Sequence, residues 1–314
     1  MKKIYVFGGS NIDILGFSDN QLIYQDSNRG KINISYGGVG RNIAQNIASL
    51  GGCVFFAGAV GDDEFGRLLI EHNIRHHINC DNVLVLNDKH TSTYLALHDD
   101  NKDMSIAMCD MDILESLQSD CFDHLLLDIN EDDYVVIDGN YCGDLLDKLM
   151  NLQCKIIVDP ISVNKVERFA SYLGKITIFK PNRIEAEKLC QFALVDNESY
   201  VSGIKYFLAK NVEIVIISLG KDGVIINKGS KILRYYAKAV DMVNATGVGD
   251  SFVACFTYFN YLGLDIEECV KKAIIGSIIT ALDIDTCSSS LTSDNINYLL
   301  QRYEIKEEVL CILE

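Results

Sequence analysis

The stretch Asn244-Ala245-Thr246-Gly247-Val248-Gly249-Asp250 decides how this chain is interpreted. An apolar run follows it at residues 251–258, which predicts that a buried helix begins within the stretch. A Gly-x-Gly turn at a helix N-terminus leaves several backbone N–H groups unpaired, and the helix dipole adds partial positive charge there. The glycines also let the backbone approach a phosphate closely. We therefore predict an anion hole formed by Gly247, Val248 and Gly249.

Asp250 falls in the first turn of the same predicted helix, beside the anion hole. A carboxylate at this point can accept the proton of an attacking hydroxyl group. The alternative is a tight strand-to-helix turn in which the aspartate only caps the helix. Short glycine motifs recur by chance, so the stretch alone leaves both interpretations open.

Apolar strands alternate with helical segments over most of the chain. Runs such as residues 135–138 and 212–219 are almost continuously apolar, which is typical of parallel strands buried on both faces by helices. Two segments, within residues 12–36 and 91–109, instead alternate apolar and polar side chains, as half-buried strands do. We predict a single α/β domain over residues 1–314, with a mainly parallel central sheet and a small β-sheet lid formed by these two segments.

Composition excludes several classes of protein. Of the 314 residues, 48% are hydrophobic and 23% are charged, as in a well-packed globular protein. The net charge of −16 argues against nonspecific binding to nucleic acid or to an anionic membrane surface. No apolar window is long enough for a signal peptide or a membrane span, so we expect a cytoplasmic protein. The eleven cysteines contain no Cys-x-x-Cys pair and are expected to be small buried hydrophobic residues. The six histidines are expected to be solvated.

Short polar side chains and glycines follow the first predicted strand. Asn11 and Asp13 come directly after it, where the carboxyl ends of parallel strands face a ligand crevice. They can hydrogen-bond a polyhydroxylated ligand or form a simple Asx turn. The stretch at residues 37–42, Gly-Gly-Val-Gly-Arg-Asn, leads into a helix but lacks the third glycine of a dinucleotide-binding motif. A close approach of the backbone to a sugar ring fits it better.

Two further strand ends carry candidate ligands. Asn182 and Glu185 lie three residues apart at the start of a predicted helix and share one face. Their oxygens can hold Mg²⁺ through waters and can also form a capping box. The turn with Ser218, Gly220 and Gly223 can receive nucleotide phosphates or be an ordinary hairpin turn.

Four motifs follow one another along essentially the whole chain: Asn-x-Asp, Gly-Gly before a helix with Asn, Asn-x-x-Glu, and Gly-x-Gly-Asp. Together and in this order, they resemble the PfkB/ribokinase family of carbohydrate and nucleoside kinases. The resemblance implies a ribokinase-like three-layer α/β/α fold, ATP-dependent phosphorylation of an alcohol group, and Asp250 as the catalytic base. It further implies that the anion hole is formed by Gly247, Val248 and Gly249 and that Mg²⁺ is organised by Asn182 and Glu185. The residues implied to bind ATP are Ser218, Gly220, Gly223, Thr246, Gly247 and Gly249. Those implied to hold the sugar are Asn11, Asp13, Gly37, Gly38 and Asn42.

Within the family, some stretches look most like the pseudouridine kinases: residues 26–31, 37–42, 93–95, 110–113 and 159–162. This implies phosphorylation of the ribose 5′-hydroxyl of pseudouridine, and we expect Ser27, Asn28 and Thr93 on the lid to read the base. Asn244 stands where the family usually has Asp, and Val248 where it usually has Ala. Neither change removes a catalytic group. The family often uses a monovalent cation such as K⁺ near ATP, and its ligands here are not assigned.

Three alternatives stay open. A ribokinase or an inosine- or adenosine-type kinase differs only in substrate. A non-catalytic sugar- or nucleoside-binding regulator on the same fold is opposed by the retained Asp250 and Glu185, and a nicotinamide oxidoreductase by the missing third glycine. We expect a small-molecule substrate and no nucleic-acid or membrane partner, while an edge of the lid sheet could support a homodimer.

Overall fold

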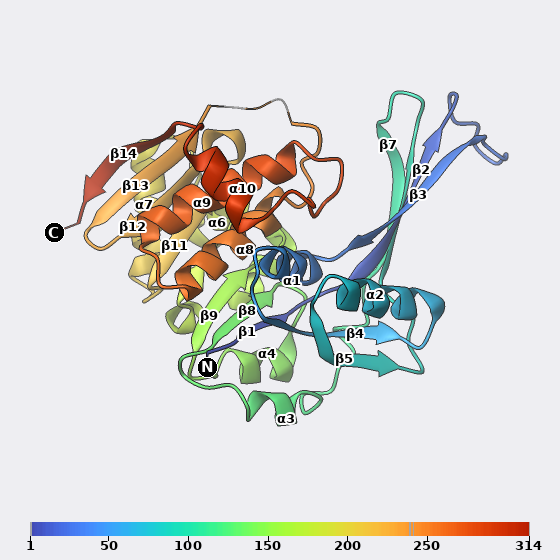
Figure 1. Cartoon of the computed structure of the whole chain (residues 1–314), viewed down its shortest axis with the longest axis horizontal. Coiled ribbons are helices and arrows are strands. Elements are labelled where there is room, and N and C mark those ends of the chain that lie inside the picture. The colour runs from blue at the N-terminus through green and yellow to red at the C-terminus, as the bar shows by residue number, and fades with distance from the viewer. Residues whose placement is uncertain (1, 239, 241, 314) are drawn as a thin grey trace.

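Two β-sheets organise the described part of this computed structural model, residues 2–238, 240 and 242–313 (Figure 1). In spatial order, the strands of the large sheet are β14 (Ile305–Ile312), β13 (Lys231–Ala237), β12 (Val224–Lys228), β11 (Ile214–Ser218), β10 (Ile178–Phe179), β9 (Lys155–Asp159), β8 (Tyr134–Asp138), β1 (Ile4–Phe7), β4 (Val54–Gly61) and β5 (Asn79–Leu86).

The strands from β11 to β5 are parallel, and β12, β13 and β14 extend the sheet as antiparallel strands. Every residue of β1 and β8 is buried, as expected for strands covered on both faces. The prediction of a mainly parallel central sheet is therefore confirmed.

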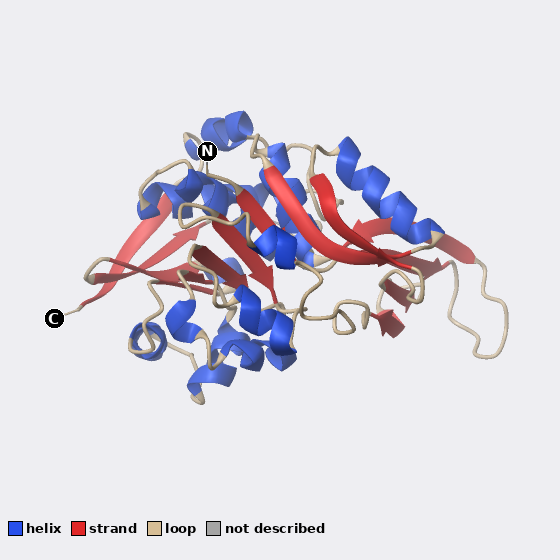
Figure 2. Ribbon diagram, turned by 90° about the horizontal axis from the view of Figure 1, so that it is seen from below, coloured by secondary structure: helices blue, strands red, loops and turns tan. Residues whose placement is uncertain are grey.

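Helices cover both faces of the large sheet (Figure 2). Along β1 the side chains alternate, so Ile4 and Val6 join one cluster of buried apolar residues while Tyr5 and Phe7 join another. The first cluster includes residues of α1 (Val39–Ser49), α8 (Val248–Tyr261), α9 (Ile266–Ala281) and α10 (Ser293–Leu300). The second includes residues of α3 (Asp123–Leu126), α4 (Gly143–Leu149), α5 (Val163–Val166), α6 (Arg183–Cys190) and α7 (Asn197–Leu208). The result is the expected three-layer α/β/α arrangement.

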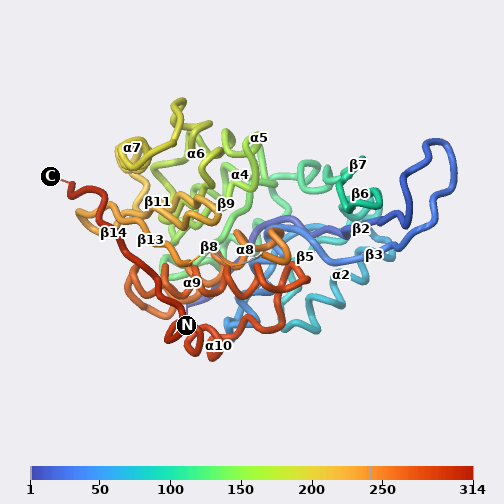
Figure 3. Tube along the Cα trace, turned by 90° about the horizontal axis from the view of Figure 1, so that it is seen from above, coloured from blue at the N-terminus to red at the C-terminus, as the bar shows by residue number. Residues whose placement is uncertain are grey.

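The small sheet extends from the three-layer body, and α2 (Glu64–Arg75) lies near its foot (Figures 1 and 3). Its strands are β3 (Gly30–Gly37), β2 (Asn11–Ser18), β6 (Thr93–His98) and β7 (Met104–Asp110). Two antiparallel hairpins meet through the parallel pair of β2 and β6. The two segments predicted to leave the βα rhythm therefore form one sheet, as the predicted fold class requires.

One face of the small sheet is apolar and open. The strand register places Ile14, Ile34, Leu95 and Met108 on a common face. Ile34 and Met108 are 59% and 70% exposed. A contiguous exposed apolar patch of this kind usually marks a site of interaction with another molecule.

Two expectations from composition meet different outcomes. No helix in the described ranges is long and apolar enough to cross a membrane. The cysteines are all free, but only Cys190, Cys255 and Cys269 are buried, and Cys53 and Cys109 are exposed. The prediction that the cysteines act as small buried residues is thus wrong for most of them, because an apolar neighbourhood in sequence does not fix which face a side chain occupies.

Candidate active site

A buried carboxylate, Asp138 at the end of β8, joins the two glycine turns of the first half of the chain. Its Oδ2 accepts hydrogen bonds from the backbone N–H of Gly9 (2.7 Å) and of Gly40 (3.0 Å). The turn after β1 and the start of α1 are thereby held against each other. A Cβ on Gly40 would lie only 2.6 Å from the Cα of Gly8, so this approach requires glycine.

This junction brings the predicted sugar-binding residues together. Asn11 pairs with Gly37 across β2 and β3, and its Nδ2 donates to Asp13 Oδ1 at 2.6 Å. A Cβ on Gly37 would lie 2.4 Å from Asp13 Oδ2. Gly38 has φ +99° and packs against the carbonyl of Gly9. Burial raises the pKa of Asp13, which the bond from Asn11 and the charge of Arg41 partly offset.

The decisive stretch forms a tight turn followed by a helix, as predicted. Gly247 is the N-cap of α8 and has φ +80°, a conformation that favours glycine. The first backbone bond into the helix runs from the N–H of Ser251 to the carbonyl of Gly247 (2.9 Å). The N–H groups of Val248, Gly249 and Asp250 precede that bond and are therefore available to an anion.

Asp250 is buried in the first turn of α8, with 9% of its surface exposed. Its Oδ2 accepts a hydrogen bond from Asn42 Nδ2 (2.7 Å), which links the helix to α1. Burial and the nearby Asp159 raise the pKa of Asp250 to about 7, against the opposing effects of Asn42, Lys180 and Arg41. A carboxyl group with a pKa near neutrality is suited to accept a proton in catalysis.

Lys180 is a residue of this site that the sequence reasoning missed. It follows β10, and its Nζ forms an ion pair with Asp159 Oδ2 (2.9 Å), each side chain being 7% exposed. Burial would lower the pKa of Lys180, but Asp159, Glu185 and Asp250 outweigh it and raise the pKa. A Cβ on Gly249 would lie 3.3 Å from this ammonium group, so a fixed positive charge adjoins the predicted anion hole.

Asn182 and Glu185 form the capping box that the sequence left as one interpretation. Asn182 Oδ1 accepts from the N–H of Glu185 (3.0 Å), and Glu185 Oε2 accepts from the N–H of Asn182 (2.8 Å). Glu185 is buried, which raises its pKa. Its Oε1 takes no part in these bonds. No three His, Cys, Asp or Glu side chains in the described ranges cluster as a metal site. Mg²⁺ at Glu185 would therefore need water or substrate oxygens, which this ion accepts readily.

The predicted ATP-binding residues come from two turns. Ser218 forms a bridge with Asn182 and donates its N–H to the carbonyl of Pro181 (3.0 Å), so it adjoins the capping box. Gly220 and Gly223 lie in the turn to β12 with φ +61° and +90°. Because β11 and β12 pair as antiparallel strands, this turn is the ordinary hairpin turn that was one of its two interpretations.

Thr246 is exposed just before the anion hole. Its N–H donates to Asn244 Oδ1 (2.9 Å), and Asn244 Nδ2 donates to the carbonyl of Ile284 (3.1 Å). The residue that replaces the family's usual aspartate thus ties the decisive stretch to the loop after α9.

Within this chain, the three residues predicted to read the base do not lie close together. Ser27 and Asn28 are exposed in the loop beyond the pairing of Ser18 with Gly30, and Asn28 bonds to Ile23 within that loop. Thr93 lies at the opposite end of the sheet, where it pairs with Ile12. The register therefore places Thr93 on the other face of the sheet from Asp13.

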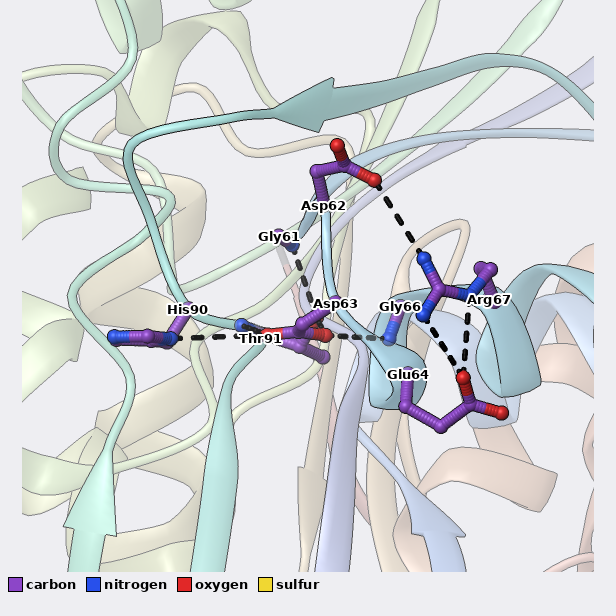
Figure 4. A network of polar contacts seen from close by, with 8 residues as sticks. All are labelled: Gly61, Asp62, Asp63, Glu64, Gly66, Arg67, His90 and Thr91. Carbon is purple, nitrogen blue, oxygen red and sulfur yellow. Dashed lines mark hydrogen bonds and ion pairs between the residues drawn. The ribbon is translucent and has the colours of Figure 1, made fainter.

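A cleft of about 390 Å³ lies at the foot of the small sheet and includes Asp63, Phe65, His90 and Thr93 in its lining. Asp63 caps α2 by accepting from the N–H of Gly66 (2.8 Å), and it also accepts from the N–H of Thr91 (2.8 Å; Figure 4). Burial alone would raise the pKa of Asp63, but the hydrogen bond from the Thr91 hydroxyl group (2.6 Å) and these two backbone bonds lower it. Asp63 therefore serves to fasten the start of β6 to α2.

His72 corrects the expectation that the histidines are all solvated. It is half-buried, stacks on Tyr36 with ring centroids 3.9 Å apart, and contacts Gln45 Oε1 at 3.2 Å. Burial and the nearby charge of Arg41 lower its pKa to about 3, so its imidazole is neutral. It belongs to the packing behind α1.

Known proteins match this chain over most of its length. Residues 1–290 match the family described as pfkB family carbohydrate kinase. The pseudouridine kinase of Escherichia coli (strain K12) is 32% identical over 275 residues, which cover 86% of this chain and 87% of that protein. The guanosine-inosine kinase of Exiguobacterium acetylicum is 28% identical and covers 95% of this chain and 100% of its own length. The solved ribokinase of Thermotoga maritima superposes with a TM-score of 0.81 at 21% identity, covering 96% of this chain and 100% of that one.

Proposed function

The chain belongs to the PfkB family of carbohydrate kinases, and we propose that it transfers the γ-phosphoryl group of ATP to the 5′-hydroxyl group of pseudouridine. Membership of the family makes it a sugar or nucleoside kinase. The observation that most supports phosphoryl transfer is Asp250, a buried carboxyl group with a pKa raised to about 7 at the N-terminus of α8. The choice of pseudouridine and the roles of individual residues are the finer parts of the proposal.

In the proposed reaction, Asp250 accepts the proton of the attacking hydroxyl group. The amide of Asn42 fixes the orientation of this carboxylate through their 2.7 Å hydrogen bond. The backbone N–H groups of Val248 and Gly249, with the ammonium group of Lys180, stabilise negative charge on the transferred phosphoryl group. Stabilisation by pre-oriented donors and fixed charges is the main source of catalysis in phosphoryl transfer.

The sugar lies, in this proposal, between the turn after β1 and the start of α1. Asp13 and Asn11 bind its hydroxyl groups, and Gly37 and Gly38 allow its ring to approach the backbone. The burial of Asn11 (6% exposed) supports this, because a buried amide beside a carboxylate gives a rigid hydrogen-bonding surface.

Pseudouridine is supported by the 32% identity with the Escherichia coli pseudouridine kinase. Ser27, Asn28 and Thr93 remain the proposed base-reading residues. A purine nucleoside is the second candidate, because the guanosine-inosine kinase covers nearly the whole chain at 28% identity. The open apolar face of the small sheet supports a homodimer, in which the loop carrying Ser27 and Asn28 would belong to an interface instead of being free in solvent.

ATP and Mg²⁺ are the proposed co-substrate and metal. Ser218, Gly220, Gly223 and Thr246 would face ATP, while Asn182 and Glu185 would hold Mg²⁺ through waters. When bound, Mg²⁺ would neutralise charge on the phosphate oxygens. A requirement for K⁺ is part of the proposal without assigned ligands, and the need for ATP supports a cytoplasmic location.

The test measures ATP consumption with Mg²⁺ against pseudouridine, uridine, ribose, inosine and guanosine, each in K⁺ and in Na⁺ buffer. Activity confined to pseudouridine, with a 5′-monophosphate as product, is the expected result. Activity on inosine or guanosine alone would keep the kinase and reject the substrate. Failure on all five substrates, together with ATP binding, would favour a different sugar or a non-catalytic binder.

A further inference from the structure

Arg41, in the first turn of α1, is the largest fully buried side chain of the described ranges, with 1% of its surface exposed. Its guanidinium group donates to neutral acceptors. Nε bonds to the carbonyl of Gly37 (2.9 Å), and Nη2 bonds to the carbonyl of Tyr36 (2.6 Å). In the part of the chain that the structure describes, only neutral groups hydrogen-bond this buried charge. Burying a charge in this way is costly, so an arginine at this place calls for a reason beyond packing.

The same guanidinium group fixes a side chain of the candidate active site. Its Nη2 donates to Asn42 Oδ1, and Asn42 Nδ2 donates to Asp250 Oδ2 at 2.7 Å. A primary amide has one oxygen and one NH₂ group. Because Arg41 holds the oxygen, the NH₂ group must point toward Asp250.

Arg41 also brings a positive charge near two carboxylates of the site. Its charge acts to lower the pKa of both Asp13 and Asp250, against the larger opposing effect of burial. The other charged or titratable groups that face Asp250 are Asp159 at the end of β9, Lys180 after β10 and Cys287 after α9. Lys180 is already paired with Asp159. Within residues 2–238, 240 and 242–313, Arg41 is the cation of this site that has no carboxylate in direct contact.

We propose that Arg41 is a positioning residue for phosphoryl transfer, which orients the Asn42 amide toward Asp250. Its positive charge also favours the ionised form of the Asp250 carboxyl group. The inference rests on the proposed role of Asp250 as the base. It adds a residue that acts through two others and does not itself touch substrate.

Two substitutions separate the two effects. Arg41→Lys keeps the charge but loses the planar fork that holds Asn42 and the two carbonyls. Arg41→Gln loses the charge as well. We expect each variant to lower kcat roughly 10–100-fold, the usual effect of removing a group that orients a functional side chain. Arg41→Gln should also move the acid limb of the kcat/KM profile upward by about one pH unit, while Arg41→Lys leaves the limb in place. Arg67→Gln, an exposed arginine on α2, is the matched control and should change neither quantity.

A double-mutant cycle with Asn42→Ala tests whether Arg41 acts through Asn42. If it does, adding Arg41→Lys to Asn42→Ala should lower kcat by less than about twofold, because the oriented amide is already absent. Full additivity of the two substitutions would overturn the positioning role. So would wild-type kcat in Arg41→Lys, or an unchanged acid limb in a folded Arg41→Gln. If Arg41→Gln fails to fold, the cycle with Arg41→Lys still decides. Normal activity in Asp250→Asn would instead reject the proposed base, whatever Arg41 does.

Discussion

Replacing Asp250 by asparagine should make the protein more stable and nearly inactive at the same time. The pKa of Asp250 rises from its ordinary 3.8 to about 7, mainly because the carboxylate is buried. This difference corresponds to about 4 kcal/mol by which the folded protein disfavours the charged form. Asparagine has nearly the same shape, can accept the same bond from Asn42, and carries no charge to desolvate.

The size of this stabilisation depends on pH in a defined way. Because the folded-state pKa of Asp250 lies above the unfolded value, the folded protein holds this proton more tightly than the unfolded chain does. The stabilisation that comes from holding this proton is fully present below pH 3.8 and is lost as the pH rises through about 7. Asp250→Asn should therefore gain about 2 kcal/mol over wild type at pH 5.5 and about 4 kcal/mol at pH 8.5.

Urea unfolding of both proteins at these two pH values measures the gain, with Asp100→Asn in the exposed turn before β7 as the control. Turnover should fall roughly 10²–10⁴-fold in Asp250→Asn, as expected when a general base is removed. A stability difference that does not grow with pH would refute the argument that Asp250 titrates near neutrality. Near-normal turnover would remove Asp250 from the proposed role.

Two further substitutions, each with a control or a rescuing variant, test the predicted anion hole and the buried ion pair beside it. Gly247→Ala should lower kcat and ATP affinity together in steady-state assays, because its Cβ would lie 2.2 Å from the carbonyl oxygen of Thr286 at φ +80°. Gly263→Ala, at φ +88° but with open space around its Cβ, should cost about 1 kcal/mol of stability and no activity. Lys180→Met should destabilise the protein by about 3–5 kcal/mol in urea unfolding, because Asp159 is left buried without a partner. Adding Asp159→Asn should recover part of that loss, and an unchanged unfolding midpoint in Lys180→Met would contradict the buried ion pair.

The fold class could be predicted because burial leaves a direct trace in the sequence. β8 is buried on both faces, and its sequence is an unbroken apolar run from Tyr134 to Ile137 before its terminal aspartate. The alternation of polar and apolar residues in β3 identified a strand of the small sheet, but it also predicted one buried face, whereas six of its eight residues are exposed. Gly38 and Gly247 were also recognisable, since positive φ at the start of a helix leaves few residues other than glycine. These features are local, and local features can be inferred from neighbouring residues.

The joint position of Ser27, Asn28 and Thr93 could not be inferred in the same way. Strand periodicity fixes which side chains share a face of one strand, but a shift of one residue in pairing moves a side chain to the other face. Thr93 pairs with Ile12 and not with Asp13, and that register is a property of the assembled sheet. All three residues lie in lid segments, but Ser27 and Asn28 lie beyond one end of β2 and Thr93 lies at its other end.

Buried charges were the other feature hidden from the sequence, and they decide how Asp250 can work. A desolvated carboxyl group beside Asp159 alone would be protonated at neutral pH, and one paired directly with a cation would be a weak base. The structure gives each cation other partners: Lys180 bonds Asp159, and Arg41 bonds neutral acceptors including the Asn42 oxygen. Asp250 receives its contact from the neutral amide of Asn42 and feels both charges from a distance. The placement of these cations, more than their presence, therefore keeps the pKa of the carboxyl group in the range where it can take a proton.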